Sequence, residues 1–326
     1  MRFSLGLCFL LLAGSVTLAD DPAKTEVGEV HFKLTHPQDD IPEFYQLKEH
    51  KFPYRMTLEQ SFPVSGFDVY KVTFPSPVKS PHPVNNTVHG TYYKPRTKKK
   101  FPCVVVLHIT GGDQALSRTI SKHLAQNGIG ALFLQMAYYG PRRPQGIRIR
   151  LLSKDINNTV AAVRQTVLDV RRATAWMESR PEVNGKRLGI LGTSLGGFVS
   201  ALSAEMEPKL DRVVIFLAGG GFVDGFYDDP RAAPMRIAWE FMGGNRAIVE
   251  RIIAPIDPIT CAKNLRKRKV LMLAANKDEI VPPKMATALW EQSGRQKIVW
   301  FNAGHYTAIL YLVPALEHAV KHLRAE

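Results

Sequence analysis

The chain has 326 residues, 45% hydrophobic and 22% charged, a composition typical of a soluble globular protein with a full core. The formal net charge is +14, but the basic residues are scattered and no nucleic-acid-binding motif accompanies them. We therefore expect a solvated basic surface and no nucleic-acid partner. Only Cys103 and Cys261 lie beyond the N-terminal segment, which excludes a disulfide-rich scaffold and a multi-cysteine metal site.

Residues 1–19 have the layout of a secretory signal peptide. Arg2 precedes an apolar stretch from Leu5 to Ala13 that is short for a membrane span, and small residues lead to Ala19. We expect cleavage after Ala19, export to the periplasm or the medium, and no stable membrane span in the mature protein. The alternative is that this segment is retained as an N-terminal anchor.

Two kinds of pattern precede residue 101. Residues 20–53 show no clear period and are expected to form an N-terminal extension to an α/β domain that covers 54–326. Apolar and polar residues then alternate, which predicts half-buried strands at 54–62, 67–74 and 88–95, with the first two forming a hairpin.

A different pattern begins at residue 101, where FPCVVVLHI is a continuous apolar run typical of a strand buried on both faces of a parallel sheet. Strands and helices then alternate, which predicts a mostly parallel, doubly wound sheet with the earlier strands as an antiparallel edge. The predicted strands are 101–109, 129–140, 187–192, 212–218, 269–275 and 297–301, and the predicted helices are 115–128, 157–181, 195–206, 283–293 and 307–324.

Residues 219–265 interrupt this alternation. They contain two short helical patterns and several glycines and prolines. An insertion of this length between two strands is uncommon as a bare loop and more often functional. We therefore predict a helical cap over the C-terminal edge of the sheet.

The stretch GTSLGG, residues 192–197, lies where a predicted strand changes to a predicted helix. A nucleophilic serine at such a turn needs a strained backbone, and the positions two residues away must lack bulk. Gly192 and Gly196 meet this need, so Ser194 is the candidate nucleophile. The backbone N–H of Leu195 at the helix start is a candidate oxyanion donor. The alternative is a Gly-Ser turn without chemistry.

A serine hydroxyl needs a base to become nucleophilic, and the base needs an orienting acceptor. His305 directly follows the last predicted strand, and Asp278 follows the strand before it, so both leave the same sheet edge as Ser194. The order Ser, Asp, His is that of nucleophile-elbow hydrolases. Glu279 and Asp257 are rivals for the acid, and Asp257 is expected to cap a helix.

The loop LHITGGDQA, residues 107–115, is expected to supply a second oxyanion donor. The candidate is the backbone N–H of Thr110, with that of Ile109 as the alternative. His108 in the same loop is interpreted as a loop-shaping side chain, because His305 already offers a base.

Three side chains are candidate substrate contacts. Tyr138 and Arg142 follow a strand whose C-terminal end lies near the expected site, and Trp239 belongs to the cap. They could bind a sugar ring, an acidic group or an acyl group. The alternatives are a basic surface loop for the first two and core packing within the cap for the third. Nothing in the sequence indicates a metal or an organic cofactor.

The motifs GTSLGG, NKDEIVP and NAGHY, in this strand and helix order over residues 54–324, resemble the α/β-hydrolase family. Within it, the chain is most similar to secreted bacterial esterases of the dienelactone hydrolase and acetyl xylan esterase type. The resemblance implies an α/β-hydrolase fold and cleavage of a small-molecule or carbohydrate ester by Ser194, His305 and Asp278. Dienelactone hydrolase itself uses a cysteine, so a serine favours ordinary ester hydrolysis. The loop reads HITGG where relatives often have HGG, so the second oxyanion donor stays open.

Two other functions are considered. A serine peptidase of the prolyl-oligopeptidase type shares this domain, but residues 20–100 are too few for a propeller. A catalytically silent hydrolase fold that binds anionic partners is the other alternative, and the presence of all three triad residues argues against it. The sequence does not indicate an oligomeric state.

Overall fold

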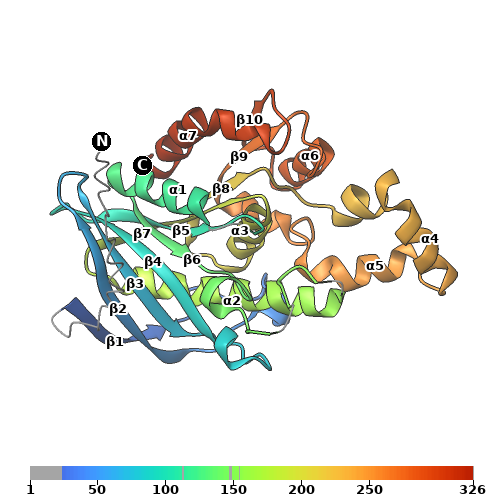
Figure 1. Ribbon diagram of the computed structural model, residues 1–326. Coiled ribbons are helices and arrows are strands. Elements are labelled where there is room, and N and C mark those ends of the chain that lie inside the picture. Colours follow the sequence, from blue (N-terminus) through green and yellow to red (C-terminus); the bar gives the residue numbers. More distant parts are fainter. Residues whose placement is uncertain (1–23, 112–113, 147–148, 154, 326) are drawn as a thin grey trace, which may run out of the picture.

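The centre of the molecule is one ten-stranded sheet with the order β1-β2-β3-β4-β6-β5-β7-β8-β9-β10 (Figure 1). The computed structural model describes residues 24–111, 114–146, 149–153 and 155–325. The predicted signal peptide over residues 1–19 lies outside these ranges and stays a prediction from the sequence.

Strands β1 to β4 pair antiparallel and join the rest of the sheet through an antiparallel β4–β6 pair. From β6 to β10 every neighbouring pair is parallel, which confirms the predicted fold class. The strands are β1 (Thr25–Phe32), β2 (His50–Phe62), β3 (Phe67–Pro75), β4 (Thr87–Pro95), β5 (Phe101–Leu107), β6 (Gly130–Leu134), β7 (Val183–Thr193), β8 (Leu210–Phe216), β9 (Lys269–Ala275) and β10 (Lys297–Phe301).

Helices cover both faces of the sheet and bury apolar side chains on it, and α3 is buried over its whole length. One face carries α1 (Ala115–Gln126) and α7 (Leu312–Arg324), whose buried side chains share a core. The other carries α2 (Ile156–Ser179), α3 (Leu195–Met206) and α6 (Pro283–Gln292), over a second core. No helix in the described part of the chain combines the length and the apolar character needed to cross a membrane.

The segment 20–53 differs from the expectation of an extension without periodic structure. Residues 25–32 form β1, which pairs antiparallel with β2 at the edge of the sheet. Buried and exposed residues alternate clearly only in the C-terminal half of β1, where Val30 and Phe32 are buried, whereas Val27 in the first half is exposed. Because β1 buries only these two side chains, the alternation of apolar and polar residues in its sequence is too weak to predict a strand.

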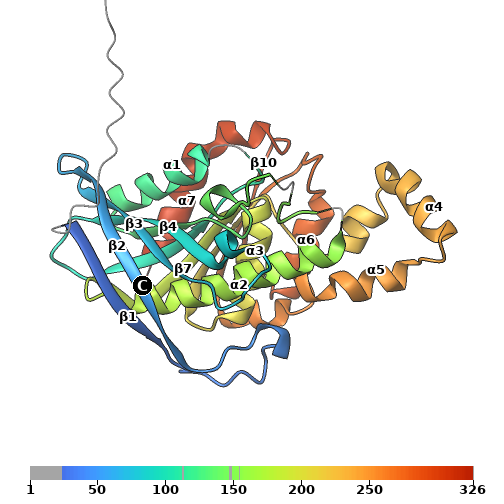
Figure 2. The ribbon, with the colours of Figure 1, turned by 60° about the horizontal axis from the view of Figure 1, so that its bottom comes forward.

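The insertion after β8 contains a π-helix (Val223–Tyr227), α4 (Ala233–Phe241) and α5 (Arg246–Ile253). Helices α4 and α5 project beyond the sheet at the right of Figures 1 and 2, on the side of the molecule away from β1. The Asp257 carboxylate fixes the start of this cap by accepting the backbone N–H groups of Gly221 at 2.8 Å and Phe222 at 2.5 Å. Short 3₁₀ turns complete the chain at Glu43–Tyr45, Pro83–Asn86, Gly140–Arg142, Pro230–Ala232, Ala254–Ile256, Ala262–Lys267 and Thr307–Tyr311.

Candidate active site

Ser194 occupies a sharp turn between β7 and α3. Its backbone has φ 53° and ψ −118°, a conformation that side-chain-bearing residues rarely adopt. The turn brings strand and helix so close that a Cβ at Gly192 would lie 2.1 Å from the carbonyl oxygen of Gly196. A Cβ at Gly196 would lie 2.5 Å from the carbonyl oxygen of Leu107. Two glycines are therefore required for this serine to project its hydroxyl from the sheet.

The structure brings Ser194, His305 and Asp278 together at the C-terminal edge of the sheet. The Ser194 Oγ lies 3.0 Å from His305 Nε2, and His305 Nδ1 lies 2.8 Å from Asp278 Oδ2. The carboxylate of Asp278 is buried, and its Oδ1 also accepts the backbone N–H groups of Ile280 and Val281. This holds the acid rigid and directs its other oxygen to the imidazole.

The two rival acids have different partners. Asp257 belongs to the cap anchor described above. The Glu279 Oε2 accepts the backbone N–H of His305 at 3.0 Å, so this carboxylate fixes the main chain that carries the imidazole and not the imidazole itself. The sequence does not distinguish these roles, because Asp278 and Glu279 are neighbouring carboxylates and only the direction of each side chain decides which one contacts the imidazole.

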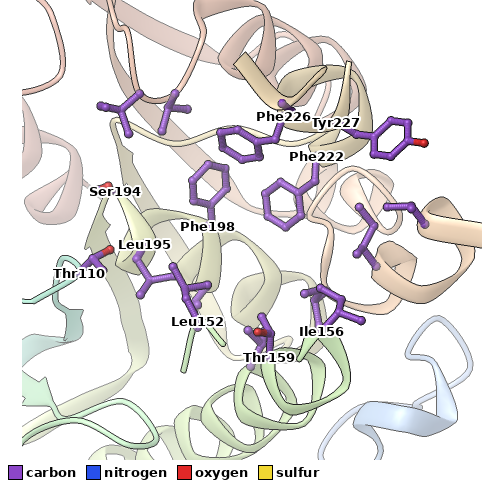
Figure 3. Close-up of a pocket in the computed structure, with 18 of the residues that line it drawn as sticks. Thr110, Leu152, Ile156, Thr159, Ser194, Leu195, Phe198, Phe222, Phe226 and Tyr227 are labelled. Carbon is purple, nitrogen blue, oxygen red and sulfur yellow. The ribbon is translucent and has the colours of Figure 1, made fainter. Parts of the chain in front are cut away.

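The candidate oxyanion donors lie on two sides of Ser194. Leu195 is the first residue of α3, where backbone N–H groups lack an intrahelical acceptor, and Thr110 lies in the loop after β5 (Figure 3). His108 fixes the start of that loop, because its Nε2 accepts the N–H of Met136 at 3.1 Å and its Nδ1–H donates to the carbonyl of Ile109 at 2.8 Å. Burial lowers the pKa of His108 to about 4, so this imidazole stays neutral at pH 7.

A pocket of about 660 Å³ opens beside Ser194 and runs under the cap (Figure 3). Its walls come from α3, the start of α2, the π-helix, α4 and α5. The rings of Phe198, Phe222 and Phe226 form one cluster within it, with centroids 5.0 to 6.4 Å apart. Sequence analysis missed these aromatic side chains, because an apolar residue next to a helix start is equally expected in the core.

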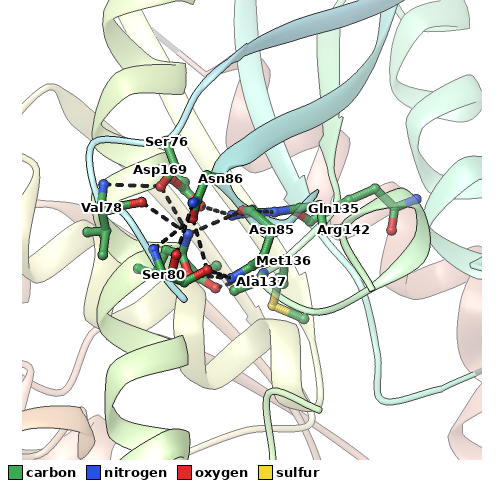
Figure 4. Close-up of polar contacts among 12 residues, drawn as sticks. Ser76, Val78, Ser80, Asn85, Asn86, Gln135, Met136, Ala137, Arg142 and Asp169 are labelled. Atoms are coloured by element: carbon green, nitrogen blue, oxygen red, sulfur yellow. Dashed lines mark hydrogen bonds and ion pairs between the residues drawn. The ribbon is translucent and has the colours of Figure 1, made fainter. Parts of the chain in front are cut away.

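Trp239 of the cap lines this pocket, and its role as a substrate contact stays a prediction. Arg142 does not, and the expectation that it contacts substrate is wrong. Its guanidinium is fully buried and forms an ion pair with Asp169 of α2 at 2.7 Å. It also donates to the backbone carbonyls of Asn85 and Gln135 (Figure 4). Arg142 thus ties the loop after β6 to the body of the domain.

Tyr138 also lies outside the pocket lining. Its backbone N–H donates to the Asn85 side chain at 3.0 Å, and its ring packs against His82. Both Tyr138 and Arg142 therefore contact Asn85, which lies in the polar network of Figure 4. Among the described residues, no three His, Cys, Asp or Glu side chains come together as ligands for a metal ion.

Comparisons with known proteins agree with this architecture. The family model for alpha/beta hydrolase domain containing 18 matches residues 51–251, which is more than half of the chain. An uncharacterized protein of Mycobacterium tuberculosis is 25% identical over 189 residues, which cover 55% of this chain but only 42% of that relative.

Solved structures share the fold. An acetyl xylan esterase from Paenibacillus sp. R4 superposes with a TM-score of 0.63 and 19% identity over 82% of this chain and 88% of that one. Acetyl xylan esterase 1 from Thermoanaerobacterium sp. gives 0.59 and 20% over 83% and 88%. A Klebsiella pneumoniae protein classed with the dienelactone hydrolases gives 0.54 and 17% over 79% and 99%.

Proposed function

Because this chain belongs to the family described as alpha/beta hydrolase domain containing 18, we propose that it is a serine hydrolase that cleaves carboxylic esters through an acyl-enzyme on Ser194. The observation that carries the proposal is the continuous contact from Ser194 Oγ through His305 to Asp278, with distances of 3.0 and 2.8 Å. The names of the related structures suggest small-molecule or carbohydrate esters as substrates.

In the first half-reaction, His305 Nε2 takes the hydroxyl proton as Ser194 Oγ attacks the ester carbonyl carbon. The carbonyl π electrons move to the oxygen, and the backbone N–H groups of Leu195 and Thr110 stabilise this oxyanion. The tetrahedral intermediate then expels the alcohol, which receives its proton from His305. Asp278 holds the imidazole in the tautomer with hydrogen on Nδ1 and stabilises its cation.

In the second half-reaction, His305 takes a proton from water, and the resulting hydroxide attacks the acyl-enzyme. Collapse of the second tetrahedral intermediate releases the carboxylic acid, and the proton on His305 returns to Ser194. The proton transfers use Ser194, His305 and Asp278, which are already in hydrogen-bond contact.

The test is the variant Ser194→Ala, with Ser179→Ala at the end of α2 as the matched control. We expect Ser194→Ala to lower kcat on p-nitrophenyl esters by a factor on the order of 10⁴ or more, while the control is unchanged. A fluorophosphonate probe should label the parent and the control but not Ser194→Ala. Parent-like turnover by Ser194→Ala would refute the proposal, and faster cleavage of a peptide anilide than of the ester would favour a peptidase.

We also propose that the protein is exported with residues 1–19 as a cleavable signal. N-terminal sequencing of the protein recovered from its own host should then begin at Asp20. A chain that retains Met1 in the membrane fraction would show that the segment is an anchor.

A further inference from the structure

The lining of the pocket beside Ser194 is almost entirely apolar. Among the described residues that line it there is no carboxylate, carboxamide or histidine. Polar side chains of the lining also contact the protein itself: Arg236 Nη1 donates to the carbonyl of Tyr227, the Tyr227 hydroxyl donates to Glu240, and the Thr159 hydroxyl donates to the carbonyl of Ser153. A sugar in this space would meet few hydrogen-bond donors and acceptors, and each hydroxyl group that loses water there without gaining a partner costs free energy.

The position of the pocket relative to the triad indicates which half of the ester enters it. Ser194, Leu195 and Thr110 border the pocket, whereas His305 does not. The departing alcohol must face His305 to receive its proton, and the carbonyl oxygen must face the N–H groups of Leu195 and Thr110. The remaining substituent of the tetrahedral carbon is the acyl chain, which therefore points into the pocket.

The pocket is also much larger than an acetyl group requires. Its volume of about 660 Å³ falls in the range of about 300–1,000 Å³ that holds drug-sized ligands. Figure 3 shows Ser194 on one side of the cavity and Ile156, at the start of α2, on the other, with the Phe198 and Phe222 rings between them. An extended aliphatic chain would run along these rings under the cap.

On the basis of the function proposed above, we propose that this pocket binds the acyl chain and that the preferred substrates are esters of long, apolar acids. Acetyl esters leave the pocket filled with water and gain none of its contact energy. Each added methylene that enters the pocket raises kcat/KM by about fourfold at most. From acetate to octanoate, the expected rise is on the order of 10²–10³.

The experiment compares two homologous series with the parent enzyme below the micelle concentration of each ester. One series lengthens the acid of p-nitrophenyl esters from acetate to decanoate, and the other lengthens the alcohol of alkyl acetates. We expect kcat/KM to rise steeply in the first series and by less than about threefold in the second. Equal or better cleavage of acetate than of octanoate would overturn the inference.

A variant with a larger side chain in the pocket tests whether the acyl chain binds there. Ile156→Trp places a large ring at the far end of the cavity, and Ile237→Trp makes the same change at an exposed position of α4 outside the lining. We expect Ile156→Trp to lower kcat/KM for decanoate at least tenfold and for acetate less than twofold, with no change for Ile237→Trp. Equal losses for both esters would overturn the inference.

The two proposals fail in different ways. If Ser194 reacts with the fluorophosphonate and the parent cleaves acetate best, the proposed hydrolase stands and the acyl-chain inference falls. If no ester is cleaved and Ser194 is not labelled, both fall. Selective loss of long-chain activity in Ile156→Trp supports both.

Discussion

Replacing Arg142 by methionine should destabilise the fold without acting directly on ester cleavage. Its guanidinium is fully buried and lies 2.7 Å from the Asp169 carboxylate, which is also fully buried. The Asp169 Oδ1 accepts a hydrogen bond from the Ser76 hydroxyl, and Arg142 itself satisfies two backbone carbonyls. Removing the cation therefore leaves a buried carboxylate without its ion-pair partner.

The size of the effect follows from this burial. Breaking a buried ion pair by removing one partner costs about 3–5 kcal/mol of unfolding free energy, a large part of the stability of an ordinary domain. The double variant Arg142→Met/Asp169→Leu also removes the Asp169 carboxylate, so no buried charge is left without its ion-pair partner. We therefore expect its loss of stability to be smaller than the sum of the two single losses by about 2 kcal/mol.

Urea unfolding followed by tryptophan fluorescence measures these free energies, and kcat/KM on a p-nitrophenyl ester is measured on the folded fraction. We expect kcat/KM of Arg142→Met to stay within about threefold of the parent, because Arg142 does not line the pocket. Parent-like stability with a loss of activity above tenfold would refute the reasoning and indicate that Arg142 contacts the substrate. Strictly additive losses would refute the coupling.

Two further outcomes follow from the site. Burial lowers the folded-state pKa of His108 from 6.5 to about 4, so the unfolded chain binds more protons between these values and stability falls as the pH falls through that window. The parent should lose about 3 kcal/mol from this group between pH 6.5 and pH 4, and His108→Gln should show a flatter profile in urea unfolding at each pH. Asp278→Asn should lower kcat by a factor on the order of 10³–10⁴, because an amide no longer fixes the imidazole tautomer or stabilises its cation. Glu279→Gln alters only a contact to the backbone of His305 and should lower kcat by less than about tenfold. Similar losses for the two variants in the same ester assay would contradict the assignment of the acid.

The parallel part of the sheet and the serine turn were predictable because their signals are local. A continuous, short apolar run such as residues 101–107 is typical of a strand buried on both faces, and GTSLGG combines small residues with a strand-to-helix change. The positions of Asp278 and His305 followed from topology, since each comes directly after a parallel strand and all such strands end at the same edge.

The remaining features depend on contacts between distant parts of the chain. Arg142 follows a strand and looks like a surface cation, but its partner Asp169 is on α2, and it also donates to the backbone carbonyls of Asn85 and Gln135. The pocket was not predictable either, because apolar residues such as Phe198 pack in the same way against a neighbour or around an empty space. Only the tertiary arrangement distinguishes the two.

The cap leaves the sheet after β8 and returns before β9, whereas the candidate nucleophile, acid and base follow β7, β9 and β10. Most of the cap over the pocket thus comes from one continuous segment of the chain that contributes none of the three candidate reacting groups. Substitutions within that segment can change which acids fit the pocket without changing Ser194, Asp278 or His305. Exchange of residues 222–256 between relatives is accordingly a direct route to altered chain-length selectivity.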